Sequence, residues 1–384
     1  MFSKREIILK AVLITTSILL SVFIAELVLR VVQPDTAKRF VWQPNLQHTF
    51  YPDSTIFYGI HGASNFSINE QGLRGENFET NSTQKYLCLG GSTTECLYLD
   101  NSETWQYHLQ EQLNHQSPFT NHQFTIGSIG KSGCTTGENY IQLKYFVPQL
   151  GKIDGVIMMV GLNDMMKRLI RDTLFEKDFR FNRHIEDSLV NTIFIANAQE
   201  EIWWRRTKLF QLARNVFHKT AKVEWENVQD DKGEIFKEWR ENRQAALHVI
   251  DSMPDLTNGL EEYERHLNLI YSEAKKQGIK LIFVNQAALY KDSMTAYENS
   301  LLWMGGVGNF QTEINHPYYS PKALGKGLQL YNQCLKNFCT GKQIQFVDLA
   351  AQLPRDTSVF YDDCHFNENG AKQVARIISQ QLVR

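Results

Sequence analysis

The chain has 384 residues and a formal net charge of -2 at pH 7, so no strong electrostatic field favours a nucleic-acid partner. Hydrophobic residues make up 42% of the chain and charged residues 21%, which excludes an intrinsically disordered protein. The length suits one large domain, or a domain that carries a sizeable insertion.

The N-terminus is the most apolar part of the chain. Residues 7–25 read IILKAVLITTSILLSVFIA, and the run continues as ELVLRVV, which matches the ~20 residues of a bilayer-spanning helix. A cleaved signal peptide is the alternative, but VFIAEL is bulky where a cleavage site requires small residues. We therefore expect residues 1–32 to form a cytoplasmic N-terminus and an uncleaved anchor that contacts the membrane through residues 7–29. Basic residues on its N-terminal side place the remaining chain outside the cytoplasm, in the periplasm of a bacterium; they are Lys4, Arg5 and Lys10.

The anchor is followed by a polar, irregular stretch and then by a regular alternation. Residues 33–82 contain three prolines and four glycines, a composition that predicts a linker and an ordered lead-in without a core of its own. Apolar runs then predict buried strands, at 85–91, 122–130, 153–161, 280–286 and 344–350. Helical patterns lie between and after them, at 103–113, 138–150, 259–278, 320–339 and 367–383. This order predicts an α/β domain over residues 83–384, with a parallel sheet covered by helices on both faces.

Residues 165–255 interrupt the alternation. They are highly charged, helical in composition and rich in tryptophan, so we expect a helical insertion in the loop after the third strand. Its WWRR run at 203–206 is interpreted as a helix with two core aromatics and solvated charges. A membrane-facing or glycan-contacting patch is the alternative.

Side chains capable of acyl-transfer chemistry follow the strands of this predicted sheet. Ser92 comes directly after the first strand, in LGGSTTE, and Asn163 follows the third strand in VGLNDMM. The second strand ends in GSIGKSG, where a glycine lets backbone N–H groups approach a substrate oxygen. Near the C-terminus, Asp362 lies three residues before His365, close enough to orient an imidazole. Since the carboxyl ends of parallel strands meet at one edge, these loops are expected to lie together.

The order of these motifs resembles the SGNH/GDSL hydrolases, over residues 80–164 and 260–384. Their serine, glycine, G-x-N-D and D-x-x-H blocks look like GGSTTE, GSIGKSG, GLND and DDCH here, and INEQGLRGENF resembles the lead-in of membrane-anchored bacterial members. The chain departs from the family at Gly91, where Asp is usual, a variant shared by a G-G-S-T-T subgroup, and at Ser128, where Asn is usual. The resemblance implies a flavodoxin-like α/β/α sandwich.

The same resemblance implies a role for each motif residue. Ser92 is the expected nucleophile, His365 its base and Asp362 the third triad member, with Gly133 and Asn163 as oxyanion donors. Gly130 is the alternative to Gly133, which the register favours.

The expected activity is hydrolysis of an ester through an acyl-enzyme, on O-acetyl groups of an envelope glycan or on a lipid, without a cofactor or metal. Transfer of the acyl group to a cell-envelope polysaccharide by the same triad is one alternative. A non-catalytic scaffold that binds a glycan or a partner protein is another.

Two cysteines flank the expected site, Cys134 after the oxyanion glycine and Cys364 before the base. An exported domain can oxidise such a pair. We therefore expect either a Cys134–Cys364 disulfide that ties the histidine loop to the sheet, or two free buried thiols.

Overall fold

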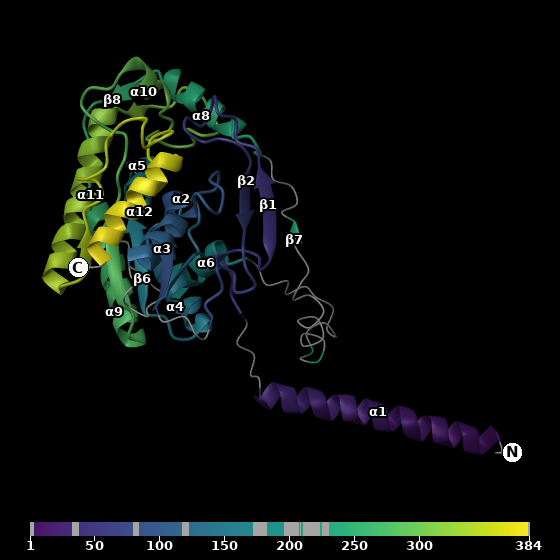
Figure 1. The fold of residues 1–384 in the computed structure, drawn as a ribbon. Coiled ribbons are helices and arrows are strands. Elements are labelled where there is room, and N and C mark those ends of the chain that lie inside the picture. Colours follow the sequence, from purple (N-terminus) through teal and green to yellow (C-terminus); the bar gives the residue numbers. More distant parts are fainter. Residues whose placement is uncertain are drawn as a thin grey trace. The chain divides into compact units, whose positions relative to one another are not determined.

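The computed structural model describes residues 4–32, 38–79, 84–116, 123–171, 183–195, 223–224 and 230–382, with Thr207 and Leu209. The chain divides into two compact units (Figure 1). The first unit comprises Met1–Arg39 with Ala196–Ala221, and the second comprises Phe40–Ile195 with Lys222–Arg384. The WWRR run at 203–206 lies outside the described residues.

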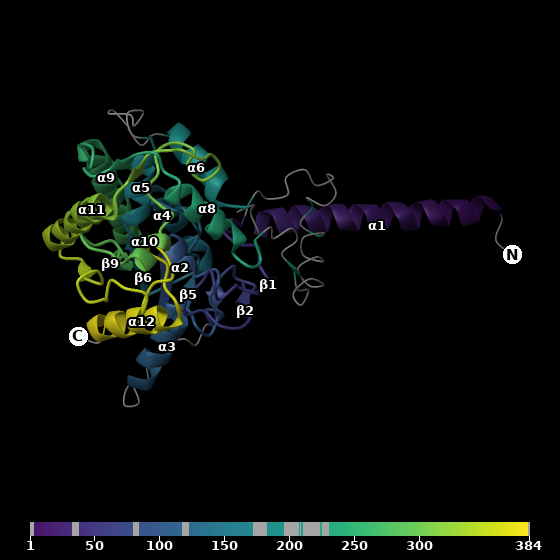
Figure 2. The same ribbon diagram turned by 90° about the horizontal axis from the view of Figure 1, so that it is seen from above.

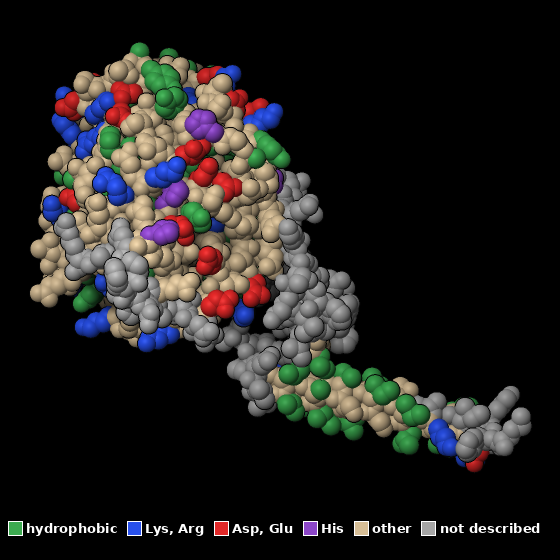
Figure 3. All heavy atoms as spheres, viewed as in Figure 1, with side chains coloured by type: hydrophobic (Ala, Val, Ile, Leu, Met, Phe, Trp, Pro, Cys, Tyr) green, Lys and Arg blue, Asp and Glu red, His purple; other side chains and the backbone are tan. Residues whose placement is uncertain are grey.

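The first unit contains one long apolar helix, α1 (Lys4–Val32). Within it, the 23 residues Ile8–Arg30 have a mean hydropathy of 2.4 over their most apolar window. Hydrophobic side chains cover this helix along its length (Figure 3). Among the described residues, this helix alone is long and apolar enough to cross a membrane. A signal sequence near the N-terminus can meet the same criteria.

The second unit is built on a six-stranded sheet. The strand order is β11 (Gln345–Val347), β9 (Lys280–Asn285), β6 (Gly155–Val160), β4 (Gln84–Gly90), β5 (Phe124–Ser128) and β3 (Arg74–Gly75). The first five are parallel, and the short β3 pairs antiparallel with β5 at the edge. Numbered along the chain, the parallel strands have the order 2-1-3-4-5, which is the flavodoxin-like arrangement. The predicted fold class is therefore confirmed, and the antiparallel edge strand is an addition to it.

Helices cover both faces of this sheet (Figure 2). On one face, α3 (Trp105–Gln116) packs against α12 (Glu368–Leu382). The other face carries α4 (Thr136–Tyr145), α5 (Leu162–Arg171), α9 (Thr257–Gln277) and α11 (Pro321–Lys342), which pack against one another. The helix predicted at 138–150 ends at Tyr145 and continues as a 3₁₀ turn, η1 (Val147–Leu150), because Pro148 cannot donate a helical hydrogen bond.

The lead-in belongs to the core of the second unit, which begins at Phe40 and not at the predicted boundary near residue 83. Two of its strands, β1 (Leu46–Phe50) and β2 (Ser64–Ser67), pair antiparallel, and β7 (Val223–Glu224) adds to β1. The side chains of Phe50, Phe57 and Phe66 are at most 1% exposed. Their burial makes this stretch part of the hydrophobic core, although its prolines and glycines indicate a linker.

The described parts of the predicted insertion also pack onto the second unit. Helix α6 (Arg183–Ile193) contacts α4. Helix α8 (Glu234–Gln244) is followed by β8 (Val249–Ile250), which pairs with β10 (Tyr318–Tyr319). The remaining short helices are α2 (Ser92–Glu95) and α10 (Ala296–Ser300).

A buried arginine from the lead-in holds the turn that follows β4. The Arg74 guanidinium donates to the backbone carbonyls of Glu95 (2.5 Å), Cys96 (2.9 Å) and Leu99 (2.5 Å). Its Nε donates to Asn101 Oδ1 at 2.8 Å. The Cys96 carbonyl also accepts from the Leu99 backbone N–H at 3.1 Å, so the arginine adds side-chain donors to a turn that lies outside regular secondary structure.

We predict that Arg74→Ala lowers the free energy of unfolding by at least about 3 kcal/mol, because several buried acceptors lose a charged donor at once. Arg74→Lys should give an intermediate loss, since one ammonium cannot reach all of these oxygens. Urea denaturation followed by circular dichroism measures both. The control is Arg376→Ala on the exposed face of α12, which should change the free energy of unfolding by less than about 0.5 kcal/mol. Equal losses in the two alanine variants would contradict a stabilising role for the Arg74 hydrogen bonds.

Candidate active site

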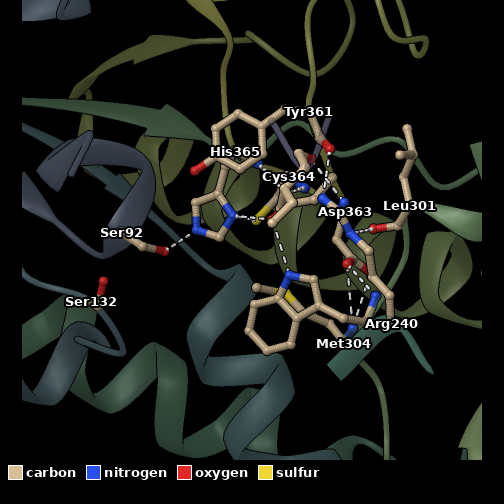
Figure 4. A network of polar contacts seen from close by, with 12 residues as sticks. Ser92, Ser132, Arg240, Leu301, Met304, Tyr361, Asp363, Cys364 and His365 are labelled. Atoms are coloured by element: carbon tan, nitrogen blue, oxygen red, sulfur yellow. Dashed lines mark hydrogen bonds and ion pairs between the residues drawn. The ribbon is translucent and has the colours of Figure 1, made fainter. Parts of the chain in front are cut away.

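A serine, a histidine and an aspartate meet at the carboxyl edge of the sheet. His365 Nε2 lies 2.7 Å from Ser92 Oγ, and His365 Nδ1 lies 2.7 Å from Asp362 Oδ2. Figure 4 shows the His365 ring directed at Ser92. Ser92 is the first residue of α2, directly after β4, and the other two residues lie on the turn before α12. The structure therefore brings the three predicted triad residues into hydrogen-bonding contact.

The Asp362 carboxylate is fully buried and accepts four hydrogen bonds. Its Oδ1 accepts from the backbone N–H groups of Cys364 (3.0 Å) and His365 (2.9 Å). Its Oδ2 accepts from Trp303 Nε1 at 3.0 Å as well as from the imidazole. Although burial raises its pKa, the imidazole and these N–H groups hold the pKa of Asp362 below its usual value. The carboxylate thus stays ionised and fixes the ring in one orientation.

The His365 imidazole is enclosed by aromatic rings. Tyr361 stacks on it, with centroids 5.5 Å apart and an interplanar angle of 12°. Phe236 from α8 meets it edge-on, with centroids 6.2 Å apart. Burial alone would lower the pKa of His365, but the Asp362 carboxylate raises that pKa well above 6.5. The ring is therefore a stronger base than a solvated histidine.

Two glycines before the nucleophile leave room for its neighbours. A Cβ on Gly90 would lie 2.3 Å from Thr94 Oγ1, and a Cβ on Gly91 would lie 2.1 Å from Asn163 Nδ2. The Asn163 amide thus occupies the space that an aspartate at position 91 would need. The turn expected at Ser92 is a four-residue helix that ends with Cys96 in the left-handed conformation (φ 52°).

A small cavity of about 10 Å³ lies beside the nucleophile and is lined by Ser92, Asn163 and Cys134, among others. Asn163 Nδ2 donates to the Cys134 carbonyl at 2.8 Å. A primary amide has two N–H donors. Within the described chain only one of them is used, in the bond to Cys134, so the second is available to a substrate oxygen.

The two candidate oxyanion glycines have different surroundings. The Gly130 N–H donates to Ser128 Oγ at 3.3 Å, and a Cβ on Gly130 would lie 2.5 Å from the Glu95 nitrogen. Gly133 is exposed, with φ +77° and open space where a Cβ would be. It directly precedes the cavity residue Cys134 but is not itself a lining residue. Of the two, Gly133 has the more accessible backbone.

Asp164 joins the loops that carry these groups. Its carboxylate accepts from the Thr136 backbone N–H (3.1 Å) and hydroxyl (2.5 Å), so it caps the first turn of α4. Burial raises the pKa of Asp164 to about 7. Together with the adjacent Asn163, it fixes the segment from Cys134 to Thr136 against the first turn of α5.

The Cys134–Cys364 disulfide is not formed, and the alternative of free thiols holds. All six cysteines are free, and both of these are buried. The Cys364 sulfur lies 3.9 Å from His365 Nδ1, at the Asp362 end of the ring. Cys134 lines the cavity at the Ser92 end, so the imidazole and its hydrogen bonds lie between the two positions.

Sequence reasoning missed the residues that support the histidine loop. Besides Trp303, these include Arg240 from α8, which donates to the carbonyls of Ile56 (2.8 Å), Leu301 (3.1 Å) and Tyr361 (3.1 Å) (Figure 4). This arginine joins the insertion, the lead-in and the histidine loop. The one available signal was its place in the tryptophan-rich stretch 165–255, one residue after Trp239.

A second buried aspartate also supports this loop. Asp363 accepts from the Tyr290 hydroxyl (2.9 Å) and the Trp303 backbone N–H (2.8 Å). Burial and the neighbouring Asp362 raise the pKa of Asp363 to about 6. It faces away from the imidazole and anchors the loop to the segment after β9.

The potential metal ligands found among the described residues are Asp362, Cys364 and His365, whose ligand atoms lie within 4.8 Å of one another. They belong to the triad loop itself. Because Nδ1 and Oδ2 already share a hydrogen bond of 2.7 Å, the arrangement suits proton transfer.

No protein-family model matches this chain, and no curated protein matches it. Among solved structures, a member of the lipolytic G-D-S-L family from Veillonella parvula is 11% identical, with 78% of this chain and 99% of that chain covered and a TM-score of 0.41. An acetylxylan esterase from Geobacillus stearothermophilus is 14% identical, with 78% and 94% covered and a TM-score of 0.40. A GDSL-like lipase from Bacteroides thetaiotaomicron is 10% identical, with 79% and 89% covered and a TM-score of 0.37. These scores are low, so the fold assignment rests on the strand order.

We predict that kcat/KM falls on the acid side with an apparent pKa above 6.5, the usual value for histidine. His365 must be neutral to accept the Ser92 proton, and its raised pKa means that this neutral form is lost as the pH falls through the raised value. A pH–rate profile of kcat/KM with a short-chain ester measures this apparent pKa. Asp362→Asn should lower the rate by about 10⁴-fold and should also lower the apparent pKa. An apparent pKa below 6.5 in the unmodified protein would contradict the effect of the Asp362 carboxylate on the imidazole.

Proposed function

We propose that this protein is a serine esterase of the SGNH/GDSL type, in which Ser92 is the nucleophile, His365 the base and Asp362 the residue that orients it. The observation that supports the proposal most strongly is the continuous chain of contacts from Ser92 Oγ through the imidazole to Asp362, with both distances 2.7 Å. It lies at the carboxyl edge of a flavodoxin-like sheet, where such sheets bind their substrates.

In the first half of the reaction, Ser92 Oγ attacks the acyl carbonyl while His365 Nε2 takes its proton. The C–O bond to the leaving alcohol then breaks, and Nε2 returns the proton to that oxygen. An acyl-enzyme remains, and water attacks it by the same sequence of proton transfers. Asp362 remains ionised throughout and stabilises the imidazolium.

The negative charge on the carbonyl oxygen needs donors on the other side of the nucleophile. We assign these to the backbone N–H groups of Ser92 and Gly133 and to the second amide N–H of Asn163. Support comes from the cavity that Ser92 and Asn163 both line. Its volume of about 10 Å³ is close to the least space that holds one water, which favours a short acyl group such as acetyl.

The location follows from α1. We propose that residues 7–29 anchor the protein in a membrane with the N-terminus in the cytoplasm, since Arg5 and Lys10 lie near that end of the apolar span. The second unit would then act outside the cytoplasm, on acyl groups of the cell envelope.

A labelling experiment with a fluorophosphonate tests the nucleophile. We expect the full-length protein in detergent to be labelled at Ser92 and to hydrolyse p-nitrophenyl acetate faster than longer esters. Ser92→Ala should lose both properties, because no other hydroxyl contacts His365 Nε2 in the described chain. Unlabelled protein that still folds would favour a non-catalytic scaffold.

We also predict that Asn163→Ala lowers kcat by about 10²–10³-fold with little change in stability, as expected for the loss of one oxyanion donor. Steady-state kinetics on p-nitrophenyl acetate measure the effect, and thermal melts check the fold. The matched control is Asn369→Ala on α12, an exposed amide that does not line the cavity beside Ser92. Turnover within a factor of about three of the unmodified protein would remove Asn163 from the oxyanion site.

Acyl transfer to a sugar hydroxyl is a second candidate. It is favoured by a polar cavity of about 270 Å³ at the carboxyl ends of β9 and β11, which could hold an acceptor. Transfer would appear as an acylated sugar when a free saccharide is added to the ester reaction, whereas hydrolysis alone gives only free acid.

A further inference from the structure

The larger cavity lies on the same edge of the sheet as the nucleophile. It is formed by the end of β9, one face of α11 and the segment that follows β11. Its volume of about 270 Å³ is just below the range typical of drug-sized ligands, so it suits a molecule of about one ring.

One residue separates this cavity from the catalytic one. Gln286, directly after β9, lines both. On the catalytic side its Oε1 accepts from the hydroxyl of Thr93 (3.3 Å), the residue after the nucleophile. On the other side Asn332 of α11 holds its backbone, donating to the Gln286 carbonyl at 2.9 Å and accepting from its N–H at 3.2 Å. A ligand in the larger cavity therefore lies one residue away from the acyl site.

Primary amides dominate the polar lining of the larger cavity. Each offers both donors and an acceptor, which matches the hydroxyl groups of a sugar, since these also donate and accept. The amides are Asn285, Gln286, Gln329, Asn332 and Gln333. Asn285 is committed to the fold, because it donates to Asp348 (2.8 Å) and accepts from the Ala350 N–H (2.9 Å).

The ends of Gln329 and Gln333 are the adaptable part of this lining. They lie one turn apart on α11, and both side chains are exposed. Gln333 Nε2 donates to Asn337 Oδ1 at 2.8 Å, a bond that does not use its acceptor oxygen. Replacing both side chains by alanine therefore removes hydrogen-bonding groups from the cavity without leaving a hole in the hydrophobic core.

The cavity lining has two cationic side chains and one anionic side chain. Lys336 pairs with Asp348 at 3.4 Å, and Arg355 donates to the Tyr290 carbonyl at 3.4 Å. Such a mixed polar lining disfavours an acyl chain, which would leave these groups without water or partners. It suits a hydroxylated ring, which replaces the lost water contacts one by one.

We propose that this cavity is a sugar subsite that holds one residue of a glycan while a neighbouring residue presents its ester to Ser92. The assignment deepens the proposed esterase function and names its substrate class. It also gives Gln286 a second role, as the contact between the subsite and the nucleophile turn.

Binding is measured first, on full-length Ser92→Ala protein in detergent, so that catalysis does not enter. Saturation-transfer NMR with glucose, galactose, N-acetylglucosamine and glucuronate should show transfer to at least one sugar. Adding Gln329→Ala and Gln333→Ala should weaken that binding about tenfold, as expected for two lost hydrogen bonds. Lys326→Ala, an exposed change on the same helix outside the cavity, is the matched control and should bind like its parent.

Activity then separates the subsite from the triad. In the otherwise unmodified protein, the double glutamine variant should raise KM for an acetylated disaccharide that joins the sugar that binds to an ester-bearing residue, and leave p-nitrophenyl acetate hydrolysis unchanged. If no sugar binds, or if the double variant binds sugar as the control does, the assignment of the cavity as a sugar subsite is wrong. Continued hydrolysis of p-nitrophenyl acetate would then show that the esterase proposal is unaffected. If Ser92→Ala keeps the hydrolytic activity, the proposed esterase function fails, while sugar binding stands as a separate result.

Discussion

The contact between His365 Nε2 and Ser92 Oγ, at 2.7 Å, joins side chains 273 positions apart in the chain, and much of the buried polar structure serves to hold it. The serine is fixed by β4 and α2, while the histidine lies on an irregular turn whose backbone is not part of the sheet. A contact of this length needs both ends to be placed within a few tenths of an ångström. The structure meets that requirement with buried side-chain donors in places where regular secondary structure supplies none.

Two buried arginines carry most of that task, one at each end of the contact. Arg74 binds three carbonyls around the end of α2, and Arg240 binds three carbonyls that include the one of Tyr361 beside the triad. A planar guanidinium with five donors can satisfy several carbonyls that point in different directions. Both come from segments outside the five parallel strands, so the lead-in and the insertion are structural parts of the site.

The sequence was sufficient to predict the parallel sheet, its covering helices and the convergence of Ser92, Asn163, Asp362 and His365. These follow from local patterns: apolar runs define the strands, and parallel strands bring their carboxyl ends together. Contacts such as Trp303 to Asp362, or Arg240 to the Ile56 carbonyl 184 positions away, have no local pattern.

The lead-in was misjudged for a related reason. Phe50, Phe57 and Phe66 are buried at irregular spacing, so no helical or strand period marks them as core. The pairing of Cys134 with Cys364 was equally undetermined, because proximity to one site does not fix which side of the imidazole each sulfur occupies.

The insertion explains why the triad carboxylate is so well shielded from water. Phe236 of α8 packs edge-on against the His365 ring, and Trp239 lies over Trp303 with ring centroids 4.5 Å apart. Trp303 in turn donates to Asp362, which is 0% exposed. Burial alone would lower the pKa of His365, but the charge of the Asp362 carboxylate and its hydrogen bond to the imidazole raise that pKa. The aromatic residues that α8 adds thus act through position: they pack against the imidazole and against Trp303, and so hold the ring and the carboxylate in contact.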